Sequence, residues 1–178
     1  MSDSPTVRAG SFRDSSETLN NLWNGVAEVV TGSFLFRSLD EGARRELVER
    51  GVVMVFAAGK AILREGAPGH DFFLVDRGVV EVLTRAPDGQ SVPLATLQRG
   101  AFFGEVAMLT GMPRTASVIA LTEVSAVRFD KPDIDAVLDK NPQARRLLEA
   151  MIKGRARDTA EKVVKALSQA PGAPDDTP

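Results

Sequence analysis

One short stretch of the sequence, FGEVAMLTGMPRTASV at residues 103–118, carries residue types that together could hold a phosphorylated sugar. Gly104 is placed to start a short helix, where free backbone amides attract anions and the missing Cβ lets a ligand approach. Arg114 follows nine positions after Glu105, and its guanidinium can bind a phosphate through two parallel hydrogen bonds without losing its charge. Glu105 only accepts hydrogen bonds, so it suits sugar hydroxyls and repels a phosphate. These residues suit a ligand with one anion, one sugar and one apolar ring.

The residues before this stretch indicate helices followed by many short strands. From Ser16 onward, apolar residues recur at helical spacing, which predicts an amphipathic helix with Leu19, Leu22, Trp23, Val26, Val29 and Val30 on one face. A second short helix is predicted from about Asp40 to Arg50, with Gly51 closing it. After Gly51, short β-rich runs alternate with turns that contain glycine, and Pro87-Asp88-Gly89 has the composition of a hairpin tip. This arrangement is typical of a sandwich or a barrel.

Helices return after the last β-rich run. Asp130 is placed to cap a helix that starts near Pro132 and ends near Lys140. Asn141 and Pro142 give a second start signal, because a capping residue is followed by proline at the first helical position. The long helix that follows is predicted to have a broad apolar face, formed by Leu147, Leu148, Met151, Ile152, Ala156, Ala160, Val163, Val164 and Leu167.

Composition excludes several classes of protein. The 178 residues include no cysteine, which removes disulfides and thiolate chemistry and fits a reducing compartment. The single histidine, His70, cannot form a cupin-type metal site or a catalytic dyad alone, so we expect a loop residue and no enzyme. The net charge of −2 creates no basic field toward nucleic acid or membrane. No apolar run approaches membrane-spanning length, and we expect a cytoplasmic protein that does not bind membranes.

The stretch at 103–118 closely resembles the phosphate-binding cassette of cyclic nucleotide-binding domains. The regulatory subunits of cAMP-dependent protein kinase and the catabolite activator protein are the best-known members of this family. The resemblance extends upstream through Gly59–Gly66 and Phe72–Val82, and Leu35–Asp40 looks like the helical lead-in of the kinase regulatory subunits. An isolated Arg-Thr-Ala would mean little, but the complete cassette behind matching glycine-turned strands is specific. The resemblance covers about Phe34 to Arg157.

The resemblance implies a role for each matching residue. Glu105 is expected to bind the ribose 2′-hydroxyl and Arg114 the cyclic phosphate, in a protein that needs no cofactor. The remaining ligand contacts are expected from Gly104, Val106, Ala107, Thr115 and Ala116 in the cassette and from Val82, Leu94 and Leu97 in the strands. A hydroxyl at Thr115 can favour guanine, but many cAMP binders also carry one there. The base therefore stays open, with cAMP favoured over cGMP.

The resemblance also implies the fold. We expect a mainly β protein with flanking helices, in which an eight-stranded antiparallel jelly-roll barrel follows an N-terminal helical bundle and precedes two C-terminal helices. The expected boundaries are a disordered lead-in at 1–15, an N-terminal helical segment at 16–51, the cyclic nucleotide-binding barrel at 52–130, C-terminal helices for a lid or dimer at 131–168 and a disordered tail at 169–178.

The expected output is that of a stand-alone sensor that signals through helix rearrangement to an unknown effector protein. The residues after Leu167 are too few for a helix-turn-helix, so we expect no DNA binding. The long C-terminal helix could close over the ligand as a lid or pair with a second copy as a homodimer. As a lid, it would place Leu148, Met151 or Ile152 against the base, with Arg155 nearby.

Plainer interpretations of the same residues remain open at this point. Glu105 and Arg114 could form a structural ion pair in a scaffold or interaction module that has the same fold and does not use a nucleotide. Val82, Leu94 and Leu97 could be ordinary apolar core residues. Thr115 could be selected only for its compatibility with a strand, rather than for reading a base.

Overall fold

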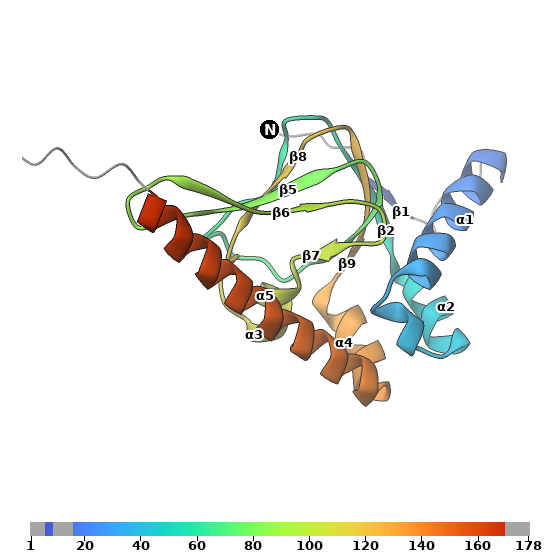
Figure 1. The fold of residues 1–178 in the computed structure, drawn as a ribbon. Coiled ribbons are helices and arrows are strands. Elements are labelled where there is room, and N and C mark those ends of the chain that lie inside the picture. The colour runs from blue at the N-terminus through green and yellow to red at the C-terminus, as the bar shows by residue number, and fades with distance from the viewer. Residues whose placement is uncertain (1–5, 9–15, 170–178) are drawn as a thin grey trace, which may run out of the picture.

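The computed structural model describes residues 6–8 and 16–169, with side chains from Asn24 to Ser168 (Figure 1). Within the expected lead-in, Thr6–Arg8 form a short strand, β1, that pairs antiparallel with the first strand after the helices. The rest of the lead-in, and residues 170–178 of the expected tail, lie outside the described residues.

The N-terminal helical segment contains the two helices that the sequence predicted. Helix α1 spans Ser16–Gly32, a short 3₁₀ helix η1 spans Phe36–Ser38, and α2 spans Glu41–Arg50. The carboxylate of Asp40 accepts a hydrogen bond from the Ala43 amide at 2.7 Å, which satisfies a free donor at the start of α2. The predicted second helix is therefore confirmed, with Gly51 directly after its last residue, and the Asp40 cap is an addition to the prediction.

The strands form two antiparallel sheets (Figure 1). Their bounds are Val52–Phe56 (β2), Ala61–Leu63 (β3), Phe72–Arg77 (β4), Val80–Arg85 (β5), Ser91–Leu97 (β6), Phe102–Phe103 (β7), Ser117–Ala120 (β8) and Val124–Phe129 (β9). The five-stranded sheet has the order β1-β2-β9-β4-β7 and the four-stranded sheet the order β3-β8-β5-β6. A mainly β fold with flanking helices is confirmed. No ladder joins the two sheets within the described residues, so the closed jelly-roll barrel is unconfirmed.

Two apolar clusters hold these layers together. One lies between the sheets and includes Phe73 and Phe103, whose rings stack with their centroids 5.0 Å apart. The other joins the five-stranded sheet to the helices, and in it Phe36 of η1 packs edge-on against Phe72 and Phe129. The sheets are thus fixed to each other and to the helices by the burial of aromatic and aliphatic side chains.

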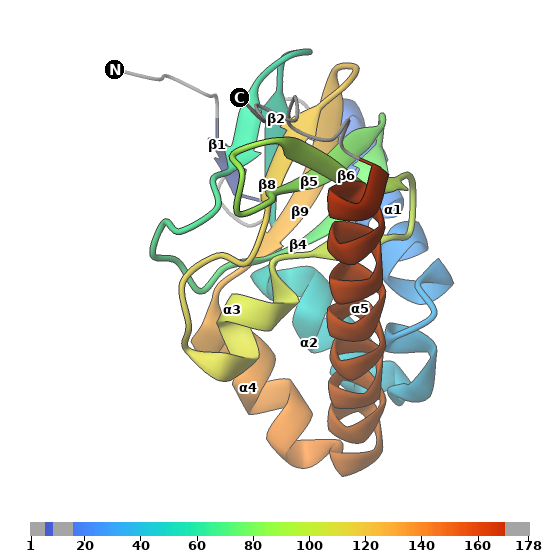
Figure 2. The same ribbon diagram turned by 60° about the vertical axis from the view of Figure 1, so that its left-hand side comes forward.

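Three helices follow or interrupt the later strands. Helix α3 spans Glu105–Thr110, α4 spans Lys131–Lys140 and α5 spans Pro142–Gln169. Figure 2 shows α5 as a long rod that runs past α3 and along β6. Its burial decreases along its length, since Leu148 is fully buried and Val164 is 63% exposed. No helix in the described part of the chain is both long and apolar enough to cross a bilayer.

The side chains predicted to cap the starts of α4 and α5 make other contacts in the structure. Asp130 occupies the capping position of α4, but its side chain makes no cap hydrogen bond and instead lies 3.3 Å from Arg128 Nη2. The Asn141 side chain donates a hydrogen bond to the Val137 carbonyl at 2.8 Å, so it satisfies the end of α4 rather than the start of α5. Both helices begin near the predicted residues, although their side-chain caps are absent.

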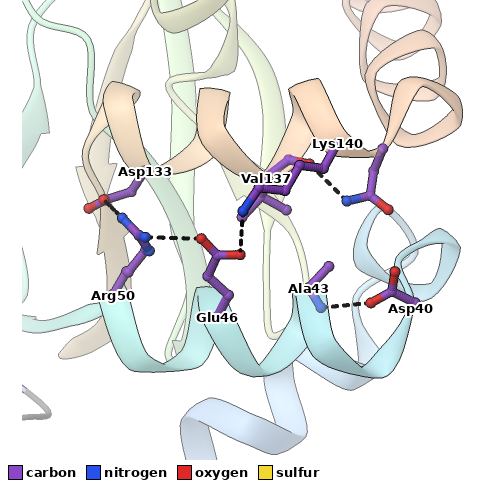
Figure 3. Close-up of polar contacts among 8 residues, drawn as sticks. Asp40, Ala43, Glu46, Arg50, Asp133, Val137 and Lys140 are labelled. Carbon is purple, nitrogen blue, oxygen red and sulfur yellow. Dashed lines mark hydrogen bonds and ion pairs between the residues drawn. The ribbon is translucent and has the colours of Figure 1, made fainter.

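Helices α2 and α4 pack side by side and are linked by exposed charges (Figure 3). Arg50 of α2 donates to Asp133 of α4 at 2.6 Å and to Glu46 of its own helix at 2.9 Å. Lys140, at the other end of α4, donates to the second oxygen of Glu46 at 3.3 Å. These contacts connect the N-terminal helices to the C-terminal ones across the base of the molecule.

Candidate functional site

A cavity of about 280 Å³ lies between α3, α5 and the four-stranded sheet. It is lined by Leu63, Val82, Leu94, Phe103, Gly104, Glu105, Val106, Ala107, Arg114, Thr115, Ala116, Val118, Arg155, Ala156 and Thr159. A second cavity of about 250 Å³ adjoins it and shares Val82, Leu94, Arg155 and Thr159. Every residue predicted to contact a ligand lines the first cavity except Leu97, which lines the second.

Gly104 sits where no other residue fits without strain. Its φ of +87° is in the left-handed region, where residues with a Cβ are disfavoured. A Cβ built there would lie 2.6 Å from the Asp71 carbonyl oxygen and 3.0 Å from Arg114 Nη1. The glycine thus permits the close approach of three chain segments at the start of α3. The sequence predicted that Gly104 starts a short helix, which is confirmed, and that its missing Cβ admits a ligand, which stays a prediction.

Arg114 is 5% exposed and is held by main-chain carbonyl groups rather than by a carboxylate. Its Nη1 donates to the Asp71 carbonyl at 2.9 Å and to the Gly104 carbonyl at 3.0 Å. None of the described residues accepts a hydrogen bond from its Nε or Nη2. Burial lowers the pKa of Arg114 from its ordinary value, and the charges of Asp71 and Glu105 partly offset this. A cation desolvated in this way, with free donors, favours an anion beside it.

The main chain around Arg114 is fixed by the loop between β3 and β4. The Arg114 amide donates to the Ala67 carbonyl at 2.9 Å, and the Gly66 amide donates to the Arg114 carbonyl at 2.8 Å. A Cβ on Gly69, whose φ is +155°, would lie 2.9 Å from Arg114 Nη2. This loop therefore positions the guanidinium. Sequence reasoning missed that role, because the loop and Arg114 are far apart in the chain and no local pattern connects them.

Glu105 is 3% exposed and forms its ion pair with α5. Its Oε1 accepts a hydrogen bond from Arg155 Nη1 at 2.6 Å. The same nitrogen donates to the Phe102 carbonyl at 3.0 Å, and the Arg155 guanidinium lies 4.5 Å from the Phe102 ring centroid. The ion-pair partner of Glu105 is thus Arg155, and no ion pair between Glu105 and Arg114 is found among the described residues.

Helix α5 covers the cavity with residues other than those expected of the lid. Leu148, Met151 and Ile152 pack in or against the apolar cluster beneath the sheets. The cavity is instead lined by Arg155, Ala156 and Thr159, which lie about one to two turns later on the helix. The sequence prediction named Arg155 only as a neighbour and missed the other two. It also missed Leu63, Phe103 and Val118, which alternation along the strands could have assigned to the inner face.

The arrangement separates three kinds of chemistry within one cavity. The free donors of Arg114 and the amides near Gly104 suit an anion. Glu105 and Arg155 offer an acceptor and donors for hydroxyl groups. Val82 and Leu94 provide an apolar wall. Among the described residues, no three His, Asp or Glu side chains gather into a group that could hold a metal ion.

Comparison with known proteins agrees with this geometry. Residues 53–141, which are 89 of the 178 residues, match the cyclic nucleotide-binding domain family. The chain belongs to this family. The match includes all the predicted ligand-contact residues, from Val82 to Ala116. The resemblance that the cassette indicated is thereby confirmed.

Several relatives of the chain are regulatory subunits of a protein kinase. The chain is 30% identical over 125 residues to a cAMP-dependent protein kinase regulatory subunit from Blastocladiella emersonii, covering 70% of this chain and 31% of that protein. It spans 24% of the corresponding subunits of Aspergillus fumigatus and Neurospora crassa, so it matches less than a third of these curated relatives.

Solved structures in the family share the fold. The catabolite activator protein of Thermus thermophilus is 27% identical with a TM-score of 0.65, covering 75% of this chain and 62% of that one. The regulatory subunit of a cAMP-independent protein kinase A from Trypanosoma cruzi, bound to guanosine, has a TM-score of 0.71 at 19% identity. It covers 83% of this chain and 52% of that chain, and at this identity it supports the fold alone.

Proposed function

We propose that this chain is a non-catalytic sensor that binds a cyclic nucleotide, cAMP in preference to cGMP, in the cavity between α3 and α5. The proposal depends on Arg114, whose guanidinium is buried. No described residue accepts a hydrogen bond from its Nε or Nη2. A ring-closed phosphate supplies the missing anion and acceptors. The amides of Gly104, Ala107 and Thr115 add donors at the start of α3 and beside Arg114.

The sugar and base follow from the rest of the lining. Glu105 accepts a hydrogen bond from the ribose 2′-hydroxyl, and the hydrogen bond from Arg155 orients this carboxylate. Val82, Leu94 and Leu97, which line the two adjoining cavities, contact the base, with Val106 and Ala116 completing the wall. The names of the relatives support this ligand class, because they include a cAMP-dependent kinase regulatory subunit and a catabolite activator protein.

Signalling to an effector protein would pass through helices α3, α4 and α5. A ligand changes the population of two arrangements only by its difference in affinity for them. In this protein that difference would arise at Glu105, which joins α3 to α5 through Arg155 at 2.6 Å. A ligand whose hydroxyl group hydrogen-bonds to Glu105 alters this contact with Arg155. As a consequence, α5 moves relative to the sheets. Hydrogen exchange of α5 with and without ligand would measure the change.

A second candidate is a nucleotide-independent interaction module on the same fold. The observation in its favour is that Glu105 already has a charged partner in Arg155 and needs no ligand to satisfy it. The two functions differ in one respect, since the module has no use for the free donors of Arg114.

Isothermal titration with cAMP, cGMP, adenosine, guanosine and 2′-deoxy-cAMP tests the proposal. Both cyclic nucleotides are expected to bind, with cAMP tighter. The nucleosides lack the phosphate and are expected to bind far more weakly, and the 2′-deoxy analogue loses the contact with Glu105. If adenosine bound as tightly as cAMP, the proposal that Arg114 binds the cyclic phosphate would be wrong. Absence of binding by both cyclic nucleotides, to a folded sample, would favour the interaction module.

A further inference from the structure

Asp71 accepts a hydrogen bond from Arg114 through its main chain, and Asp130 is an electrostatic neighbour of its carboxyl group. The main-chain carbonyl of Asp71 accepts the hydrogen bond from Arg114 Nη1 at 2.9 Å. Asp71 is also the residue before β4, and Asp130 is the residue after β9. Because Phe72 pairs with Phe129 in the antiparallel ladder of these strands, the next residues outward, Asp71 and Asp130, stand opposite each other.

The charged and titratable side chains near Asp71 and Asp130 lie on several neighbouring segments of the chain. Arg128 of β9 is within 3.3 Å of Asp130, and its Nε is buried without a hydrogen-bond partner among the described residues. Arg114 and Glu105 both line the cavity. His70, the neighbour of Asp71 in sequence, is exposed, with its Nδ1 3.5 Å from the Ala107 carbonyl. Lys131, at the start of α4, is paired with Asp135 at 2.8 Å and does not join the group.

Burial raises the pKa of Asp71 above its ordinary value. The positive charge of Arg128 works in the opposite direction, the neighbouring Asp130 raises the pKa further, and Arg114 lowers it slightly. The ionised form of Asp71 is therefore disfavoured in the folded chain. A protonated carboxyl group can donate a hydrogen bond to the other carboxylate, which two ionised groups cannot do.

We propose that Asp71 is a positioning residue for Arg114 whose carboxyl group takes up a proton as an anion binds, so that affinity for the cyclic phosphate rises as pH falls. The inference rests on the proposed function. An ionised Asp71 repels the phosphate across Arg114, and a protonated one does not. Binding and protonation then strengthen each other by the same factor, since linkage between two sites is reciprocal. Asp130 accepts the hydrogen bond from the acquired proton.

Titration calorimetry at several pH values tests this on the full chain. As pH is lowered from about 7.5 toward the raised pKa of Asp71, wild-type affinity is expected to increase, by at most about tenfold, because a ligand-induced pKa change of up to about one unit allows no more. Repeating each titration in buffers of different ionisation enthalpy measures the protons taken up. Measuring cGMP beside cAMP separates the effect from protonation of the adenine base.

The variant Asp71→Asn carries a permanent stand-in for the protonated carboxyl group. At neutral pH it is expected to bind as tightly as wild type does at low pH, with a flat profile and no proton uptake. His70→Asn is expected to keep the wild-type slope. Glu49→Gln removes one negative charge from the exposed surface of α2, and it controls for net charge.

Each outcome decides one question. A wild-type profile without proton uptake, or an Asp71→Asn profile with an unchanged slope, overturns the inference and leaves the proposed function standing. No binding at any pH overturns both. Thermal unfolding without ligand shows whether the variant folds. Because the raised pKa disfavours ionised Asp71 in the folded state, Asp71→Asn is expected to melt above wild type at neutral pH, with the difference shrinking as pH falls.

Discussion

Two clusters of charged side chains in this protein contain the same ion-pair chemistry in different surroundings. At the cavity, Glu105 is buried and pairs with Arg155, and Arg114 is buried and bound only to carbonyl groups. Between α2 and α4, Arg50 pairs with Asp133 at the same distance of 2.6 Å, but the two side chains are 41% and 27% exposed (Figure 3).

The two clusters differ in how strongly solvent reduces the interaction of their charges. Exposed pairs are screened by water and salt and contribute little to stability. A buried charge has lost its hydration and depends on whichever groups remain beside it. Distance alone therefore does not rank these contacts, and burial does. We therefore expect adding or removing one anion to have a large effect at the cavity cluster and a small one at the α2–α4 cluster.

The largest expected effect follows from removing the buried guanidinium. Arg114→Ala is expected to weaken cyclic nucleotide binding by roughly 2–5 kcal/mol, about 30- to several-thousand-fold. Arg114→Lys keeps the charge but not the two-nitrogen geometry, so its affinity for the nucleotide is expected to lie between those of wild type and Arg114→Ala. Calorimetry on variants whose circular dichroism matches wild type measures this. Undiminished binding by folded Arg114→Ala would contradict the assignment.

A smaller effect is expected from the link between α3 and α5. Glu105→Gln and Arg155→Gln, alone and combined, form a double-mutant cycle whose coupling energy should be roughly 1.5–3 kcal/mol in thermal or denaturant unfolding without ligand. The reason is that Arg155→Gln leaves the buried Glu105 carboxylate without its partner, whereas Glu105→Gln leaves Arg155, whose side chain is 36% exposed, able to reach water. Additive effects of the two changes would show that the 2.6 Å contact contributes little.

The smallest effect is expected at the exposed cluster, where Arg50→Gln and Asp133→Asn should each leave the melting temperature close to that of wild type. Raising the salt concentration should abolish any difference that remains, because these side chains are solvated. Neither change should alter nucleotide affinity. A loss of affinity in either variant would mean that the α2–α4 contact participates in binding, and the contrast between the two clusters would then fail.

Local features of the fold and site could be predicted from sequence because neighbouring residues determine them. Asp40 caps α2 through an amide three residues away, and the turn at Pro87-Asp88-Gly89 closes within its own hairpin, where Gly89 has a φ of +85°. The cassette from Gly104 to Ala116 is likewise one continuous segment of the chain. Residues from both of its ends line the cavity.

The rest depends on contacts between distant parts of the chain. Arg155 meets Glu105 across 50 residues, and Asp71 meets Arg114 across 43. No spacing rule connects such pairs before the sheets and helices have packed. Asp130 illustrates the same limit, because its position identifies a helix cap, but the nearby Arg128 takes its carboxylate. Sequence patterns assign a residue to an element, and tertiary packing then decides which group it contacts.

The uneven burial of α5 has a consequence for how fast a ligand enters. The first turns are anchored in the core through Ala144 and Leu148, whereas Val164 and Leu167 near the other end are 63% and 41% exposed. The free energy of local opening therefore falls toward the C-terminal end of the helix, and the cover over the cavity peels from that end without the core unfolding. If the proposed ligand binds in the cavity, we expect its entry to be limited by this fraying of the C-terminal end of α5.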